Sequence, residues 1–544
     1  MSSLATLPVI VLLAGSLALL LLNRAAGPRN RSRLTLLTIG AAFLALLLIA
    51  RTLPADGAIS RWRPFLGSDL AYHVDGLAFL FAVLMTVVAL AVIAPGLSRS
   101  EGPEWSSHPA LLTLLALGLG FVFSANLITL CASWIVFDLT FLWAFIRLRI
   151  THYVPRILNL GCLACLSLLA AALLLGGDSL SLRPSAVSAP VFSLVLLAAL
   201  IRVGLYPLHL WVPIGVEADL PARSLLHLVP VSAGLYLLVR LSAWTDSGLL
   251  LQLPPQGGGV GGGGAGGLAF FVGALLAWLE TGLSKTLSLV MISQVGCIIA
   301  SLAIAEPGAM IILSSLNLIL CLSLLFLSQD KVGLGRPWAR ASSALAVASL
   351  VGVPLTSGFV ARWHIYHSLL KGSHWALLAL TLSAETLFFA ALLRMWSAIS
   401  TITYPSESVR DRLPLAGAAL LAVPILVLGL HPPVLRPFAA RVSLPTLLGL
   451  LRSTALAQWA TLFLPLVGGY LLQRNQQRIF DPFEPLWLKL SAVLRLEWLC
   501  SLISQTIDAV AGALRIAGGV SEGRGYLGWI AVLGLLAFLL LRGG

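Results

Sequence analysis

Ionisable side chains inside long apolar runs are the residues of this sequence that could do chemistry. Asp138 and Glu385 each lie near the middle of such a run, and His227 lies near the start of another. A charge at the centre of a bilayer costs several kcal/mol and is tolerated mainly against a partner or water. Because carboxylates and histidines can pass protons, the pattern predicts an ion path. Two alternatives stay open: Asp138 could pair with an arginine to fix helix packing, and His227 could be a packing residue.

Two arginines lie beside breaks in apolar runs. Arg202 comes five residues before Pro207, and Arg362 follows a segment interrupted by glycines and by Pro354. A proline frees backbone carbonyls, and at membrane depth these survive only where protein or a water-filled cavity satisfies them. The break favours an interior place for each arginine. A helix end from which Arg202 snorkels, or a span that simply ends at Arg362, is the alternative.

Further polar residues surround these breaks. His209 follows Pro207 by two residues, and Glu217 begins an acidic turn before the next apolar helix. A broken helix that holds a cation beside a histidine and an acidic turn has the groups that an ion path needs. Glu385 has no ionic neighbour in the sequence and could pair with Arg362 from another helix.

Composition establishes the class of protein. Of 544 residues, 59% are hydrophobic and 10% are charged, and the mean hydropathy is +0.98. Apolar runs of about 20 residues recur without the alternation of a membrane barrel. We therefore expect an all-α polytopic membrane protein with about 14 to 16 transmembrane helices. The net charge of +13 comes from basic loops that fit cytoplasmic placement and anionic lipid, so we expect no nucleic acid partner.

The remaining segments predict how the chain is organised. The six cysteines lie in apolar runs without metal-ligand spacing, so we expect packing residues and neither a metal nor a cofactor. Residues 51–75 should form an ordered external cap, and Gln256–Gly267 should be a flexible linker. Arginines at 24–33 and at 147–156 should share the cytoplasmic face, which places the N-terminus of a retained first span outside.

Four regions follow from this pattern. Residues 1–108 hold N-terminal spans and the external loop, 109–400 a channel core, and 401–482 further spans. Residues 483–544 hold an amphipathic helix over Phe483–Ile516, which should lie along the membrane or a neighbouring subunit, and a last span at Leu527–Leu541.

The block from Tyr206 to Arg240 carries a resemblance to a known family. It contains YPLHLWVP, then EA, PARSLLH and AGLYLLVR, and it resembles the antiporter-like membrane subunits of respiratory complex I, membrane-bound hydrogenases and Mrp-type Na⁺/H⁺ antiporters. Supporting matches extend over about residues 70–400: His73–Phe79, Phe137–Thr140, Ile292–Gly296 and Gly352–Arg362.

The resemblance implies a fold and a proton path. Such subunits have two broken helices in inverted repeats and a lateral amphipathic helix. Protons are thought to follow a hydrated axis through a glutamate on the fifth helix and lysines, histidines or a glutamate on the seventh, eighth and twelfth. Asp138, Arg202 and Arg362 match the fifth, seventh and twelfth positions. Ser232 stands at the eighth-helix lysine, and residues that many members carry on a later helix are replaced by Ser314, Leu318 and Leu322.

These departures bear on function because arginine stays protonated at any working pH. The first reading is a proton-translocating subunit of a complex I-like or Mrp-like energy-converting complex. It would lie in the cell inner (plasma) membrane with other membrane subunits, move protons or Na⁺, and hold no redox centre. Whether the complex is an NADH:quinone oxidoreductase-type translocase stays open. The alternatives are a proton-driven membrane partner in inorganic-carbon uptake and a non-conducting structural or coupling subunit.

Overall fold

The computed structural model describes eleven stretches of the chain and two single residues. They are 4–22, 27–65, 68–95, 108–176, 187–212, 218–244, 261–301, 307–330, 336–402, 412–438 and 456–521, with 530 and 533. The chain divides into two units, Met1–Trp487 and Leu488–Gly544, and each is treated separately.

The described residues of the first half form eight α-helices, two 3-10 helices (η) and one hairpin. The elements are α1 (Leu7–Leu21), α2 (Pro28–Ala50), β1 (Ala55–Phe65), β2 (Ser68–Val74), α3 (Gly76–Ile93), α4 (His108–Phe123), α5 (Leu127–Arg147), η3 (Thr151–Tyr153), α6 (Val154–Leu175), α7 (Ala189–Val203), η5 (Leu208–Trp211) and α8 (Leu220–Trp244).

The second half continues with helices alone among the described residues. They are α9 (Gly261–Leu279), α10 (Leu283–Ser301), α11 (Pro307–Ser328), α12 (Arg336–Val351), α13 (Ser357–Lys371), α14 (Trp375–Thr401), α15 (Arg412–Leu430), η6 (Pro432–Leu435), α17 (Leu456–Arg474), α18 (Gln476–Phe480), η7 (Asp481–Phe483), α19 (Glu484–Leu494) and α20 (Glu497–Ser521).

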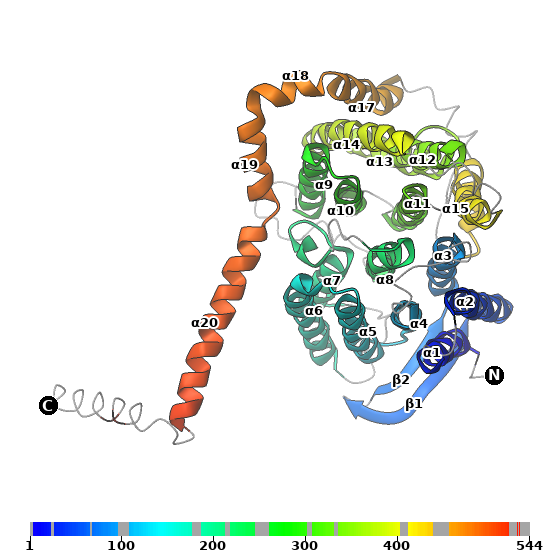
Figure 1. The fold of residues 1–544 in the computed structure, drawn as a ribbon, viewed down its shortest axis with the longest axis vertical. Coiled ribbons are helices and arrows are strands. Elements are labelled where there is room, and N and C mark those ends of the chain that lie inside the picture. Colours follow the sequence, from blue (N-terminus) through cyan, green and yellow to red (C-terminus); the bar gives the residue numbers. More distant parts are fainter. Residues whose placement is uncertain are drawn as a thin grey trace. The chain divides into compact units, whose positions relative to one another are not determined.

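The predicted all-helical membrane fold is confirmed. In the described part of the chain, nine helices are long and apolar enough to cross a membrane, and four shorter helices are apolar. Helices α8 and α11 occupy the middle of the first unit, and nearly all their residues are buried (Figure 1). Exposed leucines cover the outer faces of α1, α2 and α6, as expected for helices that face lipid.

The glycine-rich segment corrects one prediction. We expected a flexible linker over Gln256–Gly267, but residues 261–267 form the first turns of α9, and 256–260 lie outside the described residues. A Cβ on Gly266 would lie 2.7 Å from the carbonyl carbon of Ile299, and one on Gly296 would lie 2.8 Å from that of Ala269. The glycines therefore let the backbones of α9 and α10 touch, and this packing outweighs their weak helix propensity.

The expected cap is a β-hairpin that docks on the helices. Strands β1 and β2 are antiparallel, with Ala55 opposite Val74. The Asn126 side chain donates to the carbonyl of Asp69 at 2.8 Å and accepts from the backbone N–H of Thr129 at 2.8 Å. One side chain thus holds the hairpin and caps the N-terminus of α5.

The two arginine-rich turns lie on the same side of the bundle, as predicted. The hairpin joins the end of α2 to the start of α3, so the start of α2 lies on the opposite side. There His108, at the start of α4, is hydrogen-bonded to Thr35 near the start of α2 at 3.0 Å. Helix α5 returns to this side and ends at Arg147.

An ion pair joins two of the sequence motifs. Arg240 at the end of α8 binds both carboxylate oxygens of Asp75 at 2.6 and 2.7 Å. Asp75 also accepts from the backbone N–H of Ala78 at 2.9 Å and so caps α3. The two-point geometry fixes α3 against α8.

Most of the amphipathic segment belongs to the second unit. We expected one helix over Phe483–Ile516, but α19 ends at Leu494 and α20 begins at Glu497. The break coincides with Leu496, whose φ of +57° is left-handed and interrupts an α-helix. Helix α20 exposes Leu502, Val510 and Leu514. The predicted last span, Leu527–Leu541, falls almost entirely outside the described residues.

Candidate functional site

The first broken helix is formed by α7 and η5. Helix α7 ends at Val203, and Gly204 follows with a φ of +70°, a conformation that glycine adopts without strain. Pro207 lies between α7 and η5, and the indole N–H of Trp211 donates to the carbonyl of Ile201 at 2.5 Å. The bond ties η5 back to the last turn of α7.

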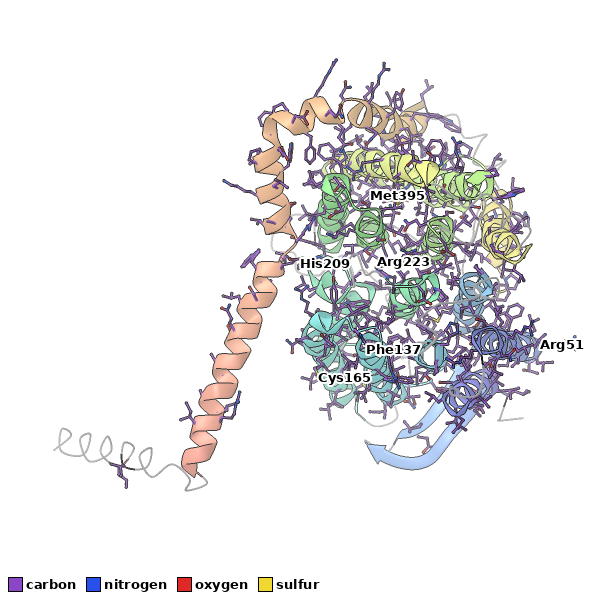
Figure 2. The ribbon with its side chains drawn as sticks, viewed as in Figure 1. Arg51, Phe137, Cys165, His209, Arg223 and Met395 are labelled. Atoms are coloured by element: carbon purple, nitrogen blue, oxygen red, sulfur yellow. The ribbon has the colours of Figure 1, made fainter. Side chains whose placement is uncertain are left out.

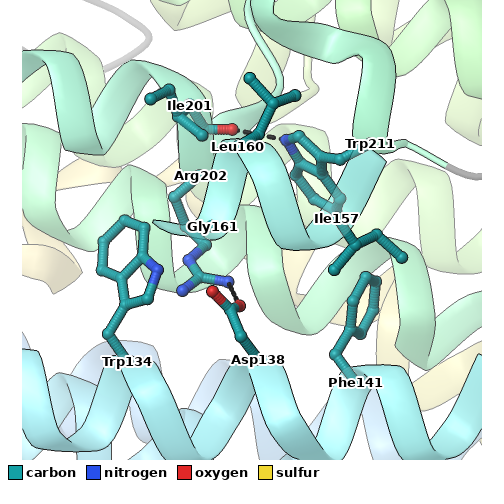
Figure 3. A pocket seen from close by; sticks show the side chains of 9 residues that line it. All are labelled: Trp134, Asp138, Phe141, Ile157, Leu160, Gly161, Ile201, Arg202 and Trp211. Carbon is teal, nitrogen blue, oxygen red and sulfur yellow. Dashed lines mark hydrogen bonds and ion pairs between the residues drawn. The ribbon is translucent and has the colours of Figure 1, made fainter. Parts of the chain in front are cut away.

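Arg202 projects from that last turn and pairs with Asp138 on α5. The Nη1 atom of Arg202 lies 2.7 Å from Oδ1 of Asp138, and the two side chains are 6% and 15% exposed. The guanidinium carbon lies 3.7 Å from the ring centre of Trp134, drawn near it in Figure 3, and 4.8 Å from that of Phe137, which is labelled in Figure 2. Arg202 is therefore interior, and the snorkelling alternative is wrong.

A small cavity borders this pair. It has a volume of about 20 Å³, which is room for about one water molecule. Its lining residues are shown in Figure 3: Trp134, Asp138, Phe141, Ile157, Leu160, Gly161, Ile201, Arg202 and Trp211. Among the described residues, Nε and Nη2 of Arg202 have no hydrogen-bond partner.

The second broken helix is formed by α12 and α13. Helix α12 ends at Val351, Gly352 has a φ of +87°, and α13 begins at Ser357 with Pro354 between them. Asn317 on α11 accepts hydrogen bonds from Ser349 at 2.6 Å and from Ser357 at 2.8 Å. A single amide thus connects both ends of the break.

Arg362 on α13 pairs with Glu385 on α14, so the pairing suggested by the sequence is present. The guanidinium also donates to the carbonyl of Leu350 at 2.7 and 3.2 Å, to Oε1 of Gln294 at 3.3 Å and to Sγ of Cys297 at 3.5 Å. Arg362 is 4% exposed and Glu385 is 2% exposed, so Arg362 does not mark a span end. The carbonyl of Leu350 belongs to the last turn of α12, where the helix dipole favours a cation.

His227 lies between the two breaks, on the central helix α8. Its Nδ1 donates to the carbonyl of Arg223 at 2.7 Å, and its Nε2 lies 3.0 Å from Oγ of Ser288 on α10. Gln294, which binds Arg362, is six residues further along α10, or about 9 Å along the helix axis. Helix α10 therefore connects the surroundings of His227 with the second pair.

The other predicted site residues lie in several places. His209 is buried and stacks on the ring of Tyr206 at 5.2 Å, and Glu217 lies outside the described residues. Ser232, at the position of the family's eighth-helix lysine, is buried, and its hydroxyl has no hydrogen-bond partner among the described residues. At this position α8 therefore carries a neutral side chain.

Four residues of the sites were missed on sequence: Trp134, Gly161, Gln294 and Asn317. Trp134 precedes Asp138 by four residues and therefore shares its helix face, which is a signal that could have found it. Asn317 is the only side-chain amide in α11. Gly161 and Gln294 carry no comparable signal, because their roles depend on which helix packs against them.

Comparison with known proteins places the chain among membrane subunits. Residues 181–388 match the family model described as NADH:quinone oxidoreductase/Mrp antiporter, TM. The chain is 27% identical over 346 residues to a probable K⁺/H⁺ antiporter subunit of Rhizobium meliloti, covering 55% of this chain and 33% of that protein. It is 26% identical over 428 residues to a subunit of the NADH-quinone oxidoreductase of Geobacillus kaustophilus, covering 68% and 83%. The chain thus spans about a third of the length of the antiporter relative.

Two solved structures share the fold. The Mrp complex from Dietzia sp. DQ12-45-1b contains a chain with a TM-score of 0.77 at 23% identity, covering 99% of this chain and 63% of that one. The membrane-bound sulfane sulfur reductase, an archaeal respiratory membrane complex, contains one with a TM-score of 0.66 at 21% identity, covering 80% and 78%. Both similar chains are parts of multi-subunit membrane complexes.

Proposed function

Because the chain belongs to the family of NADH:quinone oxidoreductase and Mrp antiporter membrane subunits, we propose that it moves protons along a buried polar axis. The axis would run from Asp138 and Arg202 through His227 to Arg362 and Glu385. The same proposal makes the chain one subunit of a larger complex in the plasma membrane, driven by a partner or by an ion gradient.

The observation that carries this proposal is the placement of two buried carboxylates, each paired with an arginine next to a helix break, among helices apolar enough to cross a membrane. A buried carboxylate is costly, and a structural role would be served as well by an apolar pair. Both acids are instead retained, each beside a cation and a break, and α8 and α10 supply polar groups between them. This arrangement suits transfer through the interior better than helix packing alone.

The chemistry assigns different roles to acids and arginines. A guanidinium stays charged, so neither Arg202 nor Arg362 can receive and release a proton. The transferable protons would sit on Asp138, on Glu385, on the ring of His227 and on water. Each arginine would act as a fixed positive charge that lowers the cost of an ionised acid beside it and repels a second cation.

Replacement of Asp138 tests the proposal. The full chain, assembled with its partners in membrane vesicles, should lose at least ten-fold of its proton uptake on Asp138→Asn while the complex still assembles. Asp56→Asn is the matched control, because the Asp56 carboxylate lies on the hairpin and is 80% exposed. Unchanged uptake in Asp138→Asn would contradict proton conduction by this chain.

A second candidate is a non-conducting coupling subunit, and two observations favour it. Arg362 is held by four groups, and Ser232 on α8 is a neutral side chain whose hydroxyl has no hydrogen-bond partner among the described residues. If the chain only couples its neighbours, Asp138→Asn and Glu385→Gln should both leave proton uptake unchanged. Deletion of residues 488–544 should then weaken assembly of the complex more than any site variant does.

A further inference from the structure

We propose that at the first break the cation stays in place and the acid moves: Asp138 leaves Arg202 by turning into space that Gly161 keeps open. This inference rests on the proposed proton conduction and assigns Gly161 as a positioning residue for that step. It reverses the simplest expectation for an ion pair, in which the longer and more flexible side chain would swing.

Arg202 is held by aromatic rings on three sides. Trp134 lies 3.7 Å from the guanidinium carbon, Phe137 4.8 Å and Phe121 5.9 Å. Cation–π contacts are strongest where water is excluded, and Arg202 is only 6% exposed. The backbone at its base is fixed as well, since Trp211 holds the carbonyl of Ile201. Movement of Arg202 would break all of these contacts at once.

Asp138 and Arg202 both line the cavity, and Asp138 faces Gly161 there. Its Oδ1 binds Arg202, while its Oδ2 faces Gly161 on α6. A Cβ on residue 161 would lie 3.2 Å from the carboxyl carbon and closer still to Oδ2. Oδ2 therefore already fills the place that a side chain at residue 161 would take, and rotation about χ1 would carry the carboxyl group from there into the cavity that Asp138 and Gly161 both line (Figure 3).

Protonation would drive the movement. The proton arrives as a hydronium ion in the cavity: one O–H bond of the hydronium breaks, an O–H bond to one carboxylate oxygen of Asp138 forms, and neutral water remains. Neutral Asp138 loses its charge attraction to Arg202 and keeps at most a weaker hydrogen bond, so it can turn toward α6, while ionised Asp138 returns. The charged and titratable groups facing Asp138 from packed elements in the described structure are Arg202 on α7 and the Cys165 thiol on α6.

Gly161→Ala tests the space directly. In the full chain within its membrane complex, proton uptake should fall at least ten-fold, because the added methyl group presses the carboxylate onto Arg202. Alanine favours helix over glycine, so α6 should not unfold. Gly40→Ala on α2 is the matched control, since a Cβ there meets nothing within 4 Å, and its uptake should equal that of the original protein. Unchanged uptake in Gly161→Ala would overturn the inference.

The same substitution in an Arg202→Lys protein tests whether Gly161 acts by allowing Asp138 to move or only through packing. Lysine lacks the flat guanidinium that stacks on rings, so Arg202→Lys should release the cation. Gly161→Ala should then cost less than three-fold in the Arg202→Lys protein, because the cation can move instead of the acid. An equal ten-fold loss in both backgrounds would show that Gly161 matters only for packing.

Infrared difference spectroscopy tests the movement without transport. The carbonyl band of protonated Asp138, identified by its loss in Asp138→Asn, should shift to lower frequency in Gly161→Ala because the acid stays hydrogen-bonded to Arg202. If the original complex moves no protons but the band shifts, the proposed function fails and this inference stands. A band that is identical in both proteins would overturn the inference.

Discussion

Each of the two broken helices holds an ion pair between an arginine and a carboxylate, but the surroundings of the two pairs differ. Arg202 has one hydrogen-bonded partner and a stack of aromatic rings, whereas Arg362 donates to Glu385, to the carbonyl of Leu350 and to side chains of α10. Stacking fixes the cation and leaves its acid free on one side. At the second break, hydrogen bonds to the carbonyl of Leu350 and to side chains of α10 fix the cation, and the acid is held by its ion pair with that cation. The ion pair at the first break is therefore suited to separate, and the pair at the second break is suited to stay together.

The helices that surround each break explain this contrast. Helices α4 and α5 supply Phe121, Trp134 and Phe137 to the first, and these rings offer no hydrogen-bond acceptors in their plane. Helix α10 supplies Gln294 and Cys297 to the second. Asn317 closes the second break further by joining Ser349 to Ser357.

The largest expected effect on stability comes from removing the ion pair between Arg362 and Glu385. Arg362→Met should lower the free energy of unfolding by about 3–5 kcal/mol, because it leaves a carboxylate with 2% exposure unpaired. Thermal unfolding of the purified protein in detergent measures this. The double variant Arg362→Met/Glu385→Leu should recover most of the loss. A double variant as unstable as the single one would mean that packing, not charge, holds this break.

The same change at the ion pair between Arg202 and Asp138 should cost less stability. Arg202→Met should lower the free energy of unfolding by about 1–3 kcal/mol, because the remaining Asp138 is 15% exposed and borders a cavity that water can enter. The same unfolding measurement applies. A loss equal to that of Arg362→Met would erase the distinction between the two breaks.

A smaller effect is expected at the amide that connects α12 and α13. Asn317→Ala removes the acceptor for two hydroxyl groups and should cost about 1–2 kcal/mol. Hydrogen exchange should become faster at the start of α13 and stay unchanged in α7. Faster exchange in both helices would indicate general loosening of the bundle.

The smallest effect is expected at the aromatic contact. Trp134→Phe keeps a ring beneath Arg202 but weakens the cation–π contact, which should cost about 0.5–1 kcal/mol. A double-mutant cycle with Arg202→Lys isolates this contact, and the coupling should be favourable in the original protein. A coupling of zero would mean that Trp134 does not restrain Arg202.

The sequence predicted the charged residues of the two sites but not the side chains that surround them. Asp138, Arg202, Arg362 and Glu385 stood out because a charge in an apolar run is rare whatever the tertiary structure. The helix breaks followed from Pro207 and Pro354 and from nearby glycines. These signals are local, and local signals survive without knowledge of packing.

What the sequence could not predict depends on contacts between helices. Gly161 is one of many glycines until α6 is seen against Asp138, and Gln294 acquires its role only from Arg362. The glycine run before Leu268 suggested a linker because glycine disfavours an isolated helix, yet close packing on α10 makes it helical. In each case tertiary contact decides the outcome.

The ion pair between Asp75 and Arg240 has a consequence for biogenesis. The partners are 165 residues apart, so a ribosome adding about 5–20 residues per second completes Arg240 roughly 10 to 30 s after Asp75. Helix α3 must therefore enter the membrane and stay in position before its ion pair with Arg240 can form. Asp75 can cap α3 from the start, because that bond needs only Ala78, and the pair with Arg240 then fastens a bundle that has already been assembled.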